Sequence, residues 1–261
     1  MKAEHDTGPA TFDFLSVITS RHCKRAFLDE PVSRADLERV LTAAAHAPSP
    51  RNTQFWQVAV LMGEARAELS RRLCAALDSP EQYEHDYTNR PSPMGATYEQ
   101  RAFAWGAEFY GAMGVNREDR AARREFERRN LCFYGAPVAM IFHLPHNAVA
   151  GTFLEMGFFL QNVMLGLVSA GLGSCPQYSV ARYADVIRDV LGLGADRLVV
   201  CSLSVGHVDE SAAINRFHPQ RAALSEYTQW HDQVPSETPS RVPPTGSSAG
   251  DGTPAPAADN A

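Results

Sequence analysis

The sequence lacks the features of a membrane-spanning, secreted or zinc-binding protein. Its five cysteines are scattered singly with no CxxC pair, a usage that fits reduced cytoplasmic thiols better than a disulfide framework or a zinc site. The first nine residues are not apolar enough for a secretory signal. The longest apolar stretch, residues 151–172, is interrupted by Glu155, Gln161 and Asn162, which are costly to bury in a bilayer. We therefore expect a cytoplasmic protein that makes no membrane contact.

Positive charge is also in short supply. The chain has 24 lysines and arginines against 30 acidic residues, a formal net charge of −6, whereas proteins that bind nucleic acid are usually basic. Arginines in residues 117–129 alternate with acidic residues, which is typical of a helix face with salt bridges. His143 and His146 are close in the sequence, but no carboxylate beside them completes a metal triad. We expect neither a nucleic-acid partner nor a metal.

The composition predicts one folded domain with flexible ends. The chain has 261 residues, 44% of them apolar, which is enough for a substantial core. Residues 233–261 contain six prolines and no aromatic residue, so they cannot bury enough apolar surface to offset the entropy of ordering. We predict a flexible N-terminus over residues 1–10, a folded domain over 11–232 and a disordered tail over 233–261.

Apolar periodicity predicts more helices than strands. Apolar residues at helical spacing predict helices over 11–20, 34–46, 64–77, 98–113, 117–130, 151–171 and 181–191. Ser33, with Asp36 three residues later, has the pattern of a helix N-cap. Short apolar runs between breakers predict strands over 57–62, 137–144 and 197–205. The fold class is therefore α/β (α+β), with helices around a modest central mixed sheet.

Two segments in the first quarter of the chain carry side chains suited to an anionic cofactor. Residues 20–27, SRHCKRAF, cluster cationic groups after a helix, and arginine can hold two phosphate oxygens at once. The same run is also typical of a solvated basic turn. Residues 47–56, APSPRNTQFW, present serine and amide groups on a proline-containing loop. Such groups can recognise the polar edge of a heteroaromatic ring, or they can simply hold a connecting loop together.

Two later segments are open to a structural as well as a functional interpretation. Residues 172–179, LGSCPQYS, follow the long apolar helix, and Gly173 there could serve as a helix C-cap. The glycines do not form a dinucleotide fingerprint, which follows a strand and opens a helix. Residues 215–227 place two arginines around a proline-containing loop, and such arginines are often only exposed surface residues.

The order of these segments is more specific than any one of them. RHCxRxF at 21–27, APSxxNxQxW at 47–56, GLGSCPQ at 171–177 and RxxLxE at 221–226 together resemble the FMN-dependent nitroreductase family. Residues 129–137 and 157–161 look most like its nitrobenzoate-reductase branch. The resemblance covers about residues 12–232. It implies a homodimeric, nitroreductase-like α+β sandwich with two FMN molecules at the dimer interface, each contacted by both subunits.

The resemblance also implies which residues hold FMN. In the first motif they are Arg21, His22, Cys23 and Arg25, and Lys24 is at a variable position. Cys23 replaces the usual serine, and because a thiol is a weaker donor than a hydroxyl, a weaker phosphate contact is expected there. The remaining residues that match the family's flavin-binding positions are Pro48, Ser49, Asn52, Gln54, Pro176, Gln177, Tyr178, Ser179 and Arg221. Arg216 is a second candidate for the phosphate.

Three functions follow from this interpretation. The first is a ping-pong reductase that uses NAD(P)H to reduce nitroaromatic or quinone-like small molecules, with no strong acid or base supplied by the protein. The second is a flavin-dependent dehydrogenase or oxidase of a small molecule. The third is a non-catalytic flavin-binding module. For the first, we expect the acceptor to bind under the excursion over residues 79–113, whose aromatic residues are also compatible with a core.

Overall fold

The computed structural model describes residues 13–116 and 118–233. The chain divides into two units, residues 1–219 and 220–261. The predicted flexible N-terminus over 1–10 and the predicted tail from residue 234 onward lie outside the described residues. The domain limits at residues 11 and 232 therefore stay predictions.

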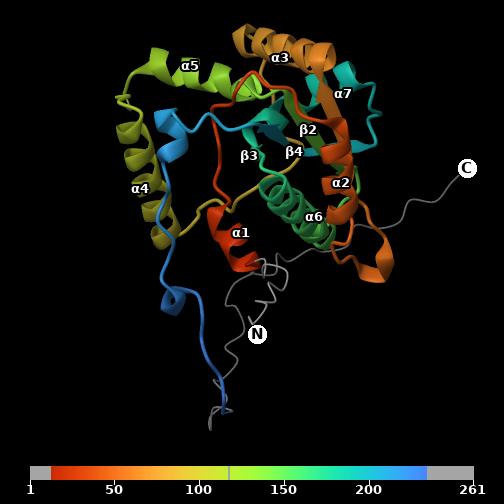
Figure 1. Ribbon diagram of the computed structural model, residues 1–261. Coiled ribbons are helices and arrows are strands. Elements are labelled where there is room, and N and C mark those ends of the chain that lie inside the picture. The colour runs from red at the N-terminus through yellow and green to blue at the C-terminus, as the bar shows by residue number, and fades with distance from the viewer. Residues whose placement is uncertain (1–12, 117, 234–261) are drawn as a thin grey trace, which may run out of the picture. The chain divides into compact units, whose positions relative to one another are not determined.

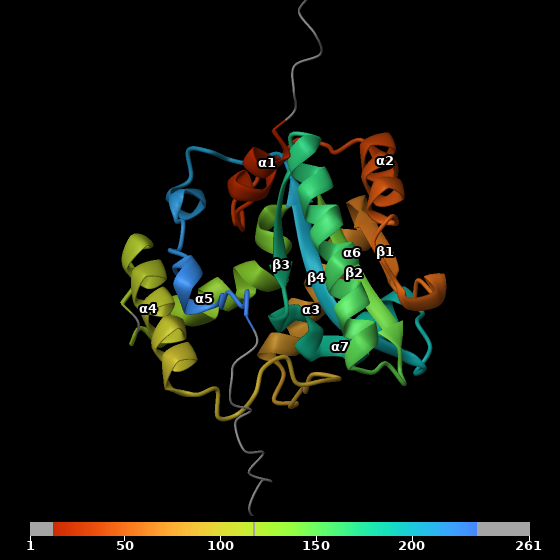
Figure 2. The ribbon, with the colours of Figure 1, turned by 90° about the horizontal axis from the view of Figure 1, so that it is seen from below.

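A four-stranded sheet forms the centre of the first unit as far as the structure describes it. Its strands are β1 (Gln57–Met62), β2 (Val138–Pro145), β3 (Gly173–Gln177) and β4 (Arg197–Gly206), in the order β1-β2-β4-β3 (Figure 2). The central strands β2 and β4 are almost entirely buried, whereas β1 is a half-exposed edge. The predicted α/β class is confirmed. The sheet was expected to be mixed, and the three pairings among its four strands are antiparallel, whereas an isolated bridge beside β3, between Cys23 and Ser174, is parallel.

Helices cover both faces of the sheet (Figure 1). On one face, α2 (Arg34–Ala44) and α6 (Ala150–Ser169) pack with alternate residues of β2 and β4 into a core that includes Leu37, Phe142 and Leu203. On the other face, α3 (Gly63–Asp78) and α7 (Ala184–Leu191) form a second core around Ile141 and Ile187. Burying each of these large apolar side chains contributes about 1.5–3 kcal/mol.

The remaining helices extend this arrangement. α1 (Phe14–Ser20) packs on α6, and α5 (Arg120–Leu131) packs on α3. α4 (Ala96–Ala112) belongs to the excursion over residues 79–113, and it lies at the outer end of α5, away from the sheet (Figures 1 and 2). The short 3₁₀ turns are η1 (Pro50–Asn52), η2 (Phe133–Gly135), η3 (Ser179–Tyr183) and η4 (Ala213–Arg216). Ser33 is the N-cap residue of α2 as predicted, although its side chain makes no capping hydrogen bond.

The strand β3 corrects the sequence interpretation of residues 172–179, which were expected to form an irregular helix exit. α6 ends at Ser169, and Gly171, at φ +73°, has the left-handed conformation that often ends a helix, so it takes the helix-ending role suggested for Gly173. Gly173 is instead the first residue of β3. The segment contains a proline, which predicts against a strand, but β3 is an edge strand and tolerates a missing amide donor.

α6 is long and apolar enough to pass a composition test for a membrane span. In the structure it is a core helix, because Met156, Phe159, Val163 and Leu167 are buried against the sheet. Its opposite face leaves Leu154 and Phe158 exposed at 59% and 41%.

The second unit is described over residues 220–233. It contains the 3₁₀ turn η5 (Leu224–Glu226), where the amide of Ala223 donates a 2.7 Å hydrogen bond to the carboxylate of Glu226. Tyr227 is exposed, and the exposed fraction of Trp230 reaches 84%.

Candidate functional site

The first and third motifs lie against each other in the structure. Cys23 pairs with Ser174 in a parallel β-bridge, and the amide of Lys24 donates a 3.0 Å hydrogen bond to the carbonyl of Ser174. The close approach depends on Gly173, because a Cβ atom at that position would collide with Val208 and would lie 3.0 Å from Cγ of Lys24. Residues 21–25 therefore continue the sheet beyond β3.

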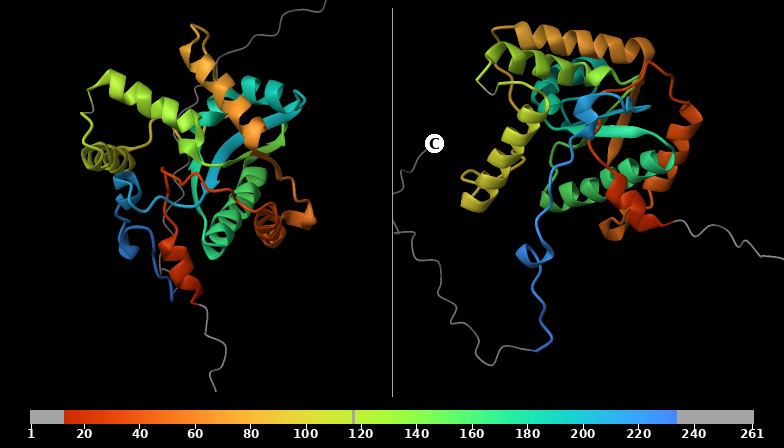
Figure 3. Two further views of the ribbon diagram at one scale, coloured as in Figure 1. Left: turned by 45° about the horizontal axis from the view of Figure 1, so that its top comes forward. Right: turned by 60° about the vertical axis from the view of Figure 1, so that its left-hand side comes forward.

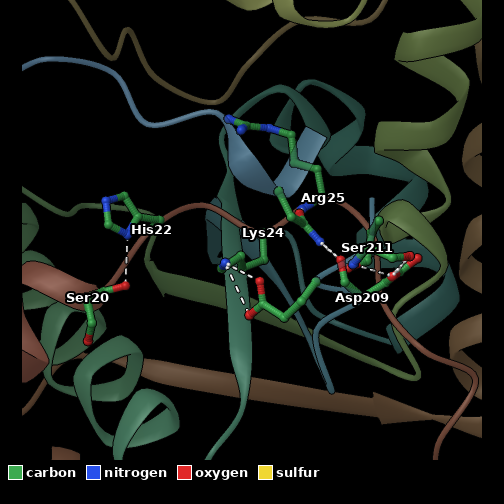
Figure 4. Close-up of polar contacts among 9 residues, drawn as sticks. Ser20, His22, Lys24, Arg25, Asp209 and Ser211 are labelled. Carbon is green, nitrogen blue, oxygen red and sulfur yellow. Dashed lines mark hydrogen bonds and ion pairs between the residues drawn. The ribbon is translucent and has the colours of Figure 1, made fainter. Parts of the chain in front are cut away.

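Side chains alternate along this extended segment, as they do in a strand. Arg21 and Arg25 both act electrostatically on Cys23, which lies between them in the sequence. Lys24 instead forms an ion pair with Glu210 at 3.3 Å. Figure 4 shows the Arg25 side chain extending away from that of Lys24. The structure therefore groups Arg21, Cys23 and Arg25, and it separates them from Lys24, the residue at the variable position.

Arg25 is held in place on several sides. Its amide donates a 2.6 Å hydrogen bond to Oδ1 of Asn215, and its guanidinium lies 5.0 Å from the ring centroid of Phe109 on α4. Burial acts to lower the pKa of Arg25, but interactions with Cys175, Tyr134 and Cys23 outweigh it and raise that pKa. The side chain is therefore a fixed cation with little freedom to reorient.

Cys23 and Cys175 form a coupled thiol pair beside these arginines. A hydrogen bond from Cys175 and the charges of Arg25 and Arg21 lower the pKa of Cys23 to about 5, against the opposing effect of burial. The same hydrogen bond, together with burial, raises the pKa of Cys175. These interactions therefore favour the charged form of Cys23, at a position where the resemblance places a serine hydroxyl.

An amide and hydroxyl network lies at the other end of β3. The buried side chain of Gln177 donates to the carbonyl oxygen of Asn130 at 2.7 Å and to its Oδ1 at 3.0 Å, and Oε1 of Gln177 accepts from Ser204 at 2.5 Å. Ser179 also donates to Oδ1 of Asn130, at 3.1 Å. Asn130 in turn donates to the hydroxyl of Tyr134 at 2.8 Å. This network fixes the side chain of Gln177 and leaves the half-buried Pro176 between it and Cys175.

His22 lies outside the arginine group. Its ring stacks on that of His218 with a centroid distance of 3.8 Å, and its Nδ1 is 2.8 Å from the carbonyl oxygen of Ser20 (Figure 4). His22 and Lys24 line a separate cavity of about 420 Å³ with Glu210. A direct contact of His22 with FMN stays a prediction.

The second motif lies at the opposite edge of the sheet. The loop that contains η1 leads directly into β1, whereas the arginine group is beside β3. The two edges are separated by three strand spacings, about 14 Å. Within the loop, Ser49 Oγ accepts from the amide of Gln54 at 3.2 Å, and Gln54 donates to the carbonyl of Asn52 at 3.1 Å. Asn52 and Gln54 have positive φ, and Pro48 is exposed with them. Within one chain, the loop of the second motif and the arginine group therefore lie apart.

Tyr178 connects the end of β3 to the excursion over residues 79–113. Its hydroxyl donates to the carbonyl of Tyr87 at 2.7 Å, and its ring stacks on His85 at 4.0 Å. Residues 84–94 and Tyr178 line a cavity of about 740 Å³. Arg221 belongs to the second unit, so its place at a phosphate stays a prediction.

Sequence reasoning missed several residues that shape this site. Ser202 and Ser204 had no signal of their own, because they are single polar residues far from the motifs. Tyr134 and Asn215 lie within segments that the sequence analysis quoted, but nothing in the sequence gave either of them a role at the site. Cys175 was interpreted as an isolated thiol, and only the pairing of residues 21–25 with β3 shows that it faces Cys23. Asn130 was quoted within the resemblance, but nothing in the sequence indicated that it holds Gln177.

The residues beside β3 fit FMN. Two arginines around the half-buried Cys23 provide a cationic end, and the amides and hydroxyls near Gln177 provide donors and acceptors about 10 Å further along the strand. An anionic phosphate matches the first group, and the polar edge of a flavin ring matches the second.

Comparisons with known proteins agree with this geometry. The model of the nitroreductase family matches residues 18–207. The chain is 36% identical over 220 residues to a 4-nitrobenzoate reductase of Pseudomonas putida, covering 84% of this chain and 96% of that protein. It is 35% identical to a chloronitrobenzene nitroreductase of Comamonas testosteroni, covering 81% and 94%. The structure of the FMN-dependent nitroreductase NfnB from Mycobacterium smegmatis in complex with NADPH matches with a TM-score of 0.80 at 33% identity, covering 83% of this chain and 97% of that one.

The chain belongs to the nitroreductase family. The family and the fold that the sequence motifs predicted are confirmed. The predicted enzyme class, an FMN- and NAD(P)H-dependent nitroreductase, is confirmed as well.

Proposed function

We propose that the protein is a homodimeric enzyme that uses NAD(P)H to reduce nitroaromatic or quinone-like small molecules in a ping-pong cycle. Its similarity to a 4-nitrobenzoate reductase and to a chloronitrobenzene nitroreductase supports a nitroaromatic acceptor. When bound, FMN supplies the hydride chemistry. The chain's own residues bind and orient the cofactor and shape the acceptor site.

Arg21 and Arg25 hold the cofactor's phosphate or pyrimidine side in this proposal. The observation that carries it is the pairing of Cys23 with Ser174, which brings the two arginines to the start of the strand that ends at Gln177. Fixed cations near the flavin favour its reduced, anionic form. His22 and Arg221 are the other residues that were predicted for this end of the cofactor, and each can be tested by its own variant.

A second copy of the chain supplies the loop of the second motif. Pro48, Ser49, Asn52 and Gln54 lie at the β1 edge, away from the arginine group of their own chain. The α1 and α6 surface beside this loop is apolar and exposed. Its exposed side chains are Phe14, Leu15, Ile18, Val149, Leu154 and Phe158. Apolar patches of this kind are typical of subunit interfaces, so we propose that this surface pairs two subunits and completes each FMN site.

The acceptor binds in the cavity between residues 84–94 and Tyr178. The rings of His85 and Tyr178 are stacked there, and Nδ1 of His85 is buried without a hydrogen-bond partner. Aromatic faces beside a polar atom suit an electron-poor aromatic ring. A cytoplasmic location, predicted from the scattered cysteines, is part of the same proposal.

The activity test is NADPH oxidation by the purified protein with and without 4-nitrobenzoate. We expect a flavin spectrum, faster NADPH oxidation with the acceptor, and parallel double-reciprocal lines for the two substrates. NADPH oxidation that does not respond to nitroaromatics or quinones would contradict the proposal. Oxidation of a small alcohol or amine without NADPH would favour the dehydrogenase or oxidase alternative.

The dimer test changes the apolar surface. Phe158→Glu places a charge in the proposed interface, so we expect a monomer that has lost most of its FMN. Tyr98→Glu, at an exposed aromatic residue on α4, is the matched control and should stay dimeric. For each variant, light scattering measures the oligomeric state, and the flavin absorbance measures the FMN content. A wild-type monomer with stoichiometric FMN would show that one chain is sufficient.

A further inference from the structure

Cys74 and Cys132 form a thiol pair outside the proposed FMN site. Their sulfur atoms are 3.4 Å apart, although the residues are 58 positions apart in the sequence. Cys74 lies on α3, and Cys132 is the C-cap of α5. Because the two sulfurs are already in contact, they need to move only about 1.4 Å closer to reach the length of a disulfide bond.

The surrounding residues hold the two helices together at this point. Asp78, the last residue of α3, accepts hydrogen bonds from Arg124 at 2.7 Å and from Arg128 at 2.8 Å, both on α5. The helices α3 and α5 run side by side in the ribbon views (Figures 1 and 3). This contact keeps the two thiols opposed without a covalent link.

An oxidant in solution can reach this pair. Both cysteines are partly exposed. They lie on the α3 and α5 side of the sheet, whereas the proposed subunit interface is on the α1 and α6 side (Figure 1). The pair therefore stays accessible in the proposed dimer.

We propose that Cys74 and Cys132 are a reversible oxidation site, which closes to a disulfide when the protein meets a hydroperoxide. The sulfur of Cys132 attacks the peroxide oxygen, which breaks the O–O bond and forms a sulfenic acid, and the thiol proton leaves with the alcohol. Cys74 then attacks the sulfenic sulfur, and its proton leaves with the hydroxyl group as water. Overall, two thiols and one hydroperoxide give one disulfide, one alcohol and one water, so the thiols are oxidised by two electrons and the peroxide is reduced by two.

The environment of the two thiols sets the order of these steps. Burial and the hydrogen bond with Cys132 raise the pKa of Cys74 to about 11, which outweighs the opposing effect of Arg128. Cys74 is therefore harder to ionise than an ordinary thiol, so we assign the first attack to Cys132 and the second to Cys74.

The disulfide would stiffen the support of the FMN site. Cys132 directly precedes η2, where Phe133 and Tyr134 both have φ of +54°, and it follows Asn130 by two residues. Asn130 holds both Gln177 and Tyr134. The new bond would fix this turn to α3 and would close a loop of 58 residues. A disulfide that closes a loop of that size restricts the unfolded chain, and it raises the thermal midpoint by at least about 5 °C when its geometry is unstrained.

The test treats the FMN-loaded protein with tert-butyl hydroperoxide, followed by alkylation under denaturing conditions and peptide mass spectrometry. In the proposed site, bound FMN covers Cys23 and Cys175 and keeps the oxidant from them. We therefore expect a linked peptide pair that contains Cys74 and Cys132, the loss of two of the five free thiols, and a thermal midpoint raised by at least about 5 °C. Dithiothreitol should reverse all three changes.

Three variants separate this pair from the others. Cys74→Ser should give no linked peptide and should leave Cys132 as a sulfenic acid that dimedone traps. Cys132→Ser should leave Cys74 unmodified. Cys23→Ser removes one thiol of the pair formed by Cys23 and Cys175, and this variant should still lose two thiols on oxidation. A link between Cys23 and Cys175 in place of Cys74 and Cys132 would overturn the proposal, as would oxidation without any linked peptide or an unchanged thermal midpoint.

Discussion

The amide of Lys24 donates a hydrogen bond of 3.0 Å to the carbonyl oxygen of Ser174. This bond, beside the bridge between Cys23 and Ser174, joins the cationic motif to the strand that carries Pro176 and Gln177. Neither motif alone carries both kinds of group that the proposed cofactor site needs. The cations come from one segment, and the fixed amide group comes from the other.

The first prediction tests whether this junction depends on Gly173. Gly173→Ala places a methyl group against Val208 and the stem of Lys24, so the Val208 side chain has to shift, and we expect residues 23–25 to be displaced from β3 with it. Because charge-assisted contacts depend on geometry, we expect FMN affinity to fall by at least about tenfold, as measured by fluorescence titration of the apo-protein. Gly111→Ala, where a methyl group meets nothing within 4 Å, is the control and should bind FMN like the wild type. Equal affinity in both variants would show that the junction does not position the arginines.

The second prediction concerns Cys23 and pH. The Cys23 pKa is lowered to about 5, so raising the pH through 5 converts the thiol to an anion that repels the phosphate. Cys23→Ser replaces that anion with a neutral donor. We expect the variant to bind FMN about tenfold more tightly than the wild type at pH 7.5, and the advantage to shrink to about two- to threefold at pH 4.5. Serine does not titrate in this range, so a change of the ratio of the two dissociation constants with pH reports the repulsion between Cys23 and the phosphate, whose own charge also rises between pH 4.5 and 7.5. A ratio that is constant with pH would place the phosphate away from this residue.

The third prediction concerns the stability of the sheet in acid. Burial and the charge of Arg197 lower the pKa of His143 to about 4 from its ordinary value of 6.5, and Nδ1 of His143 accepts a 3.0 Å hydrogen bond from Arg197. Between these two values the unfolded chain binds the proton more strongly. The contribution of neutral His143 to the free energy of unfolding is therefore fully present above pH 6.5. It is lost as the pH falls toward 4, by up to about 3 kcal/mol.

Urea denaturation at pH 7, 5.5 and 4.5 measures this effect. His143→Gln keeps an acceptor for Arg197 but does not titrate, so the free energy of unfolding should fall less with acid than in the wild type. His146→Gln, at an exposed position, should follow the wild type. An unchanged acid dependence in His143→Gln would assign the effect to other groups.

The sequence predicted the elements with strong local patterns. α6 has twenty residues of mostly apolar composition, and β2 and β4 are apolar runs that are buried on both faces, so each was found within a few residues of its ends. β3 was missed because its residues, GSCPQ, lack the apolar and β-branched side chains of a typical strand. It forms a strand because β4 pairs with it and because Gly173 allows the close approach of Lys24 and Val208.

The site was only partly predictable for the same reason. The order of the motifs predicted Arg21, Cys23, Arg25 and Gln177 as site residues, and their contacts with FMN stay predictions. Local sequence says nothing of which side of a segment faces the site. Alternation along residues 21–25 puts His22 with His218 and Lys24 with Glu210. Tertiary contacts such as those of Asn130 with Gln177 have no signal in a single sequence.

The measurement that tests the central claim most directly is the binding of FMN and of riboflavin to Arg21→Ala apo-protein. A charge-assisted contact to the phosphate is worth about 1.5–3 kcal/mol, roughly 10- to 150-fold in affinity. We predict at least a tenfold loss for FMN and a much smaller loss for riboflavin, which has no phosphate, and the same pattern for Arg221→Ala. Lys24→Met keeps the stem that packs on Gly173 and removes only the ion pair with Glu210, so it should bind both ligands like the wild type. Equal losses of FMN and riboflavin in Arg21→Ala, or no loss of either, would contradict the assignment of this cluster to the phosphate.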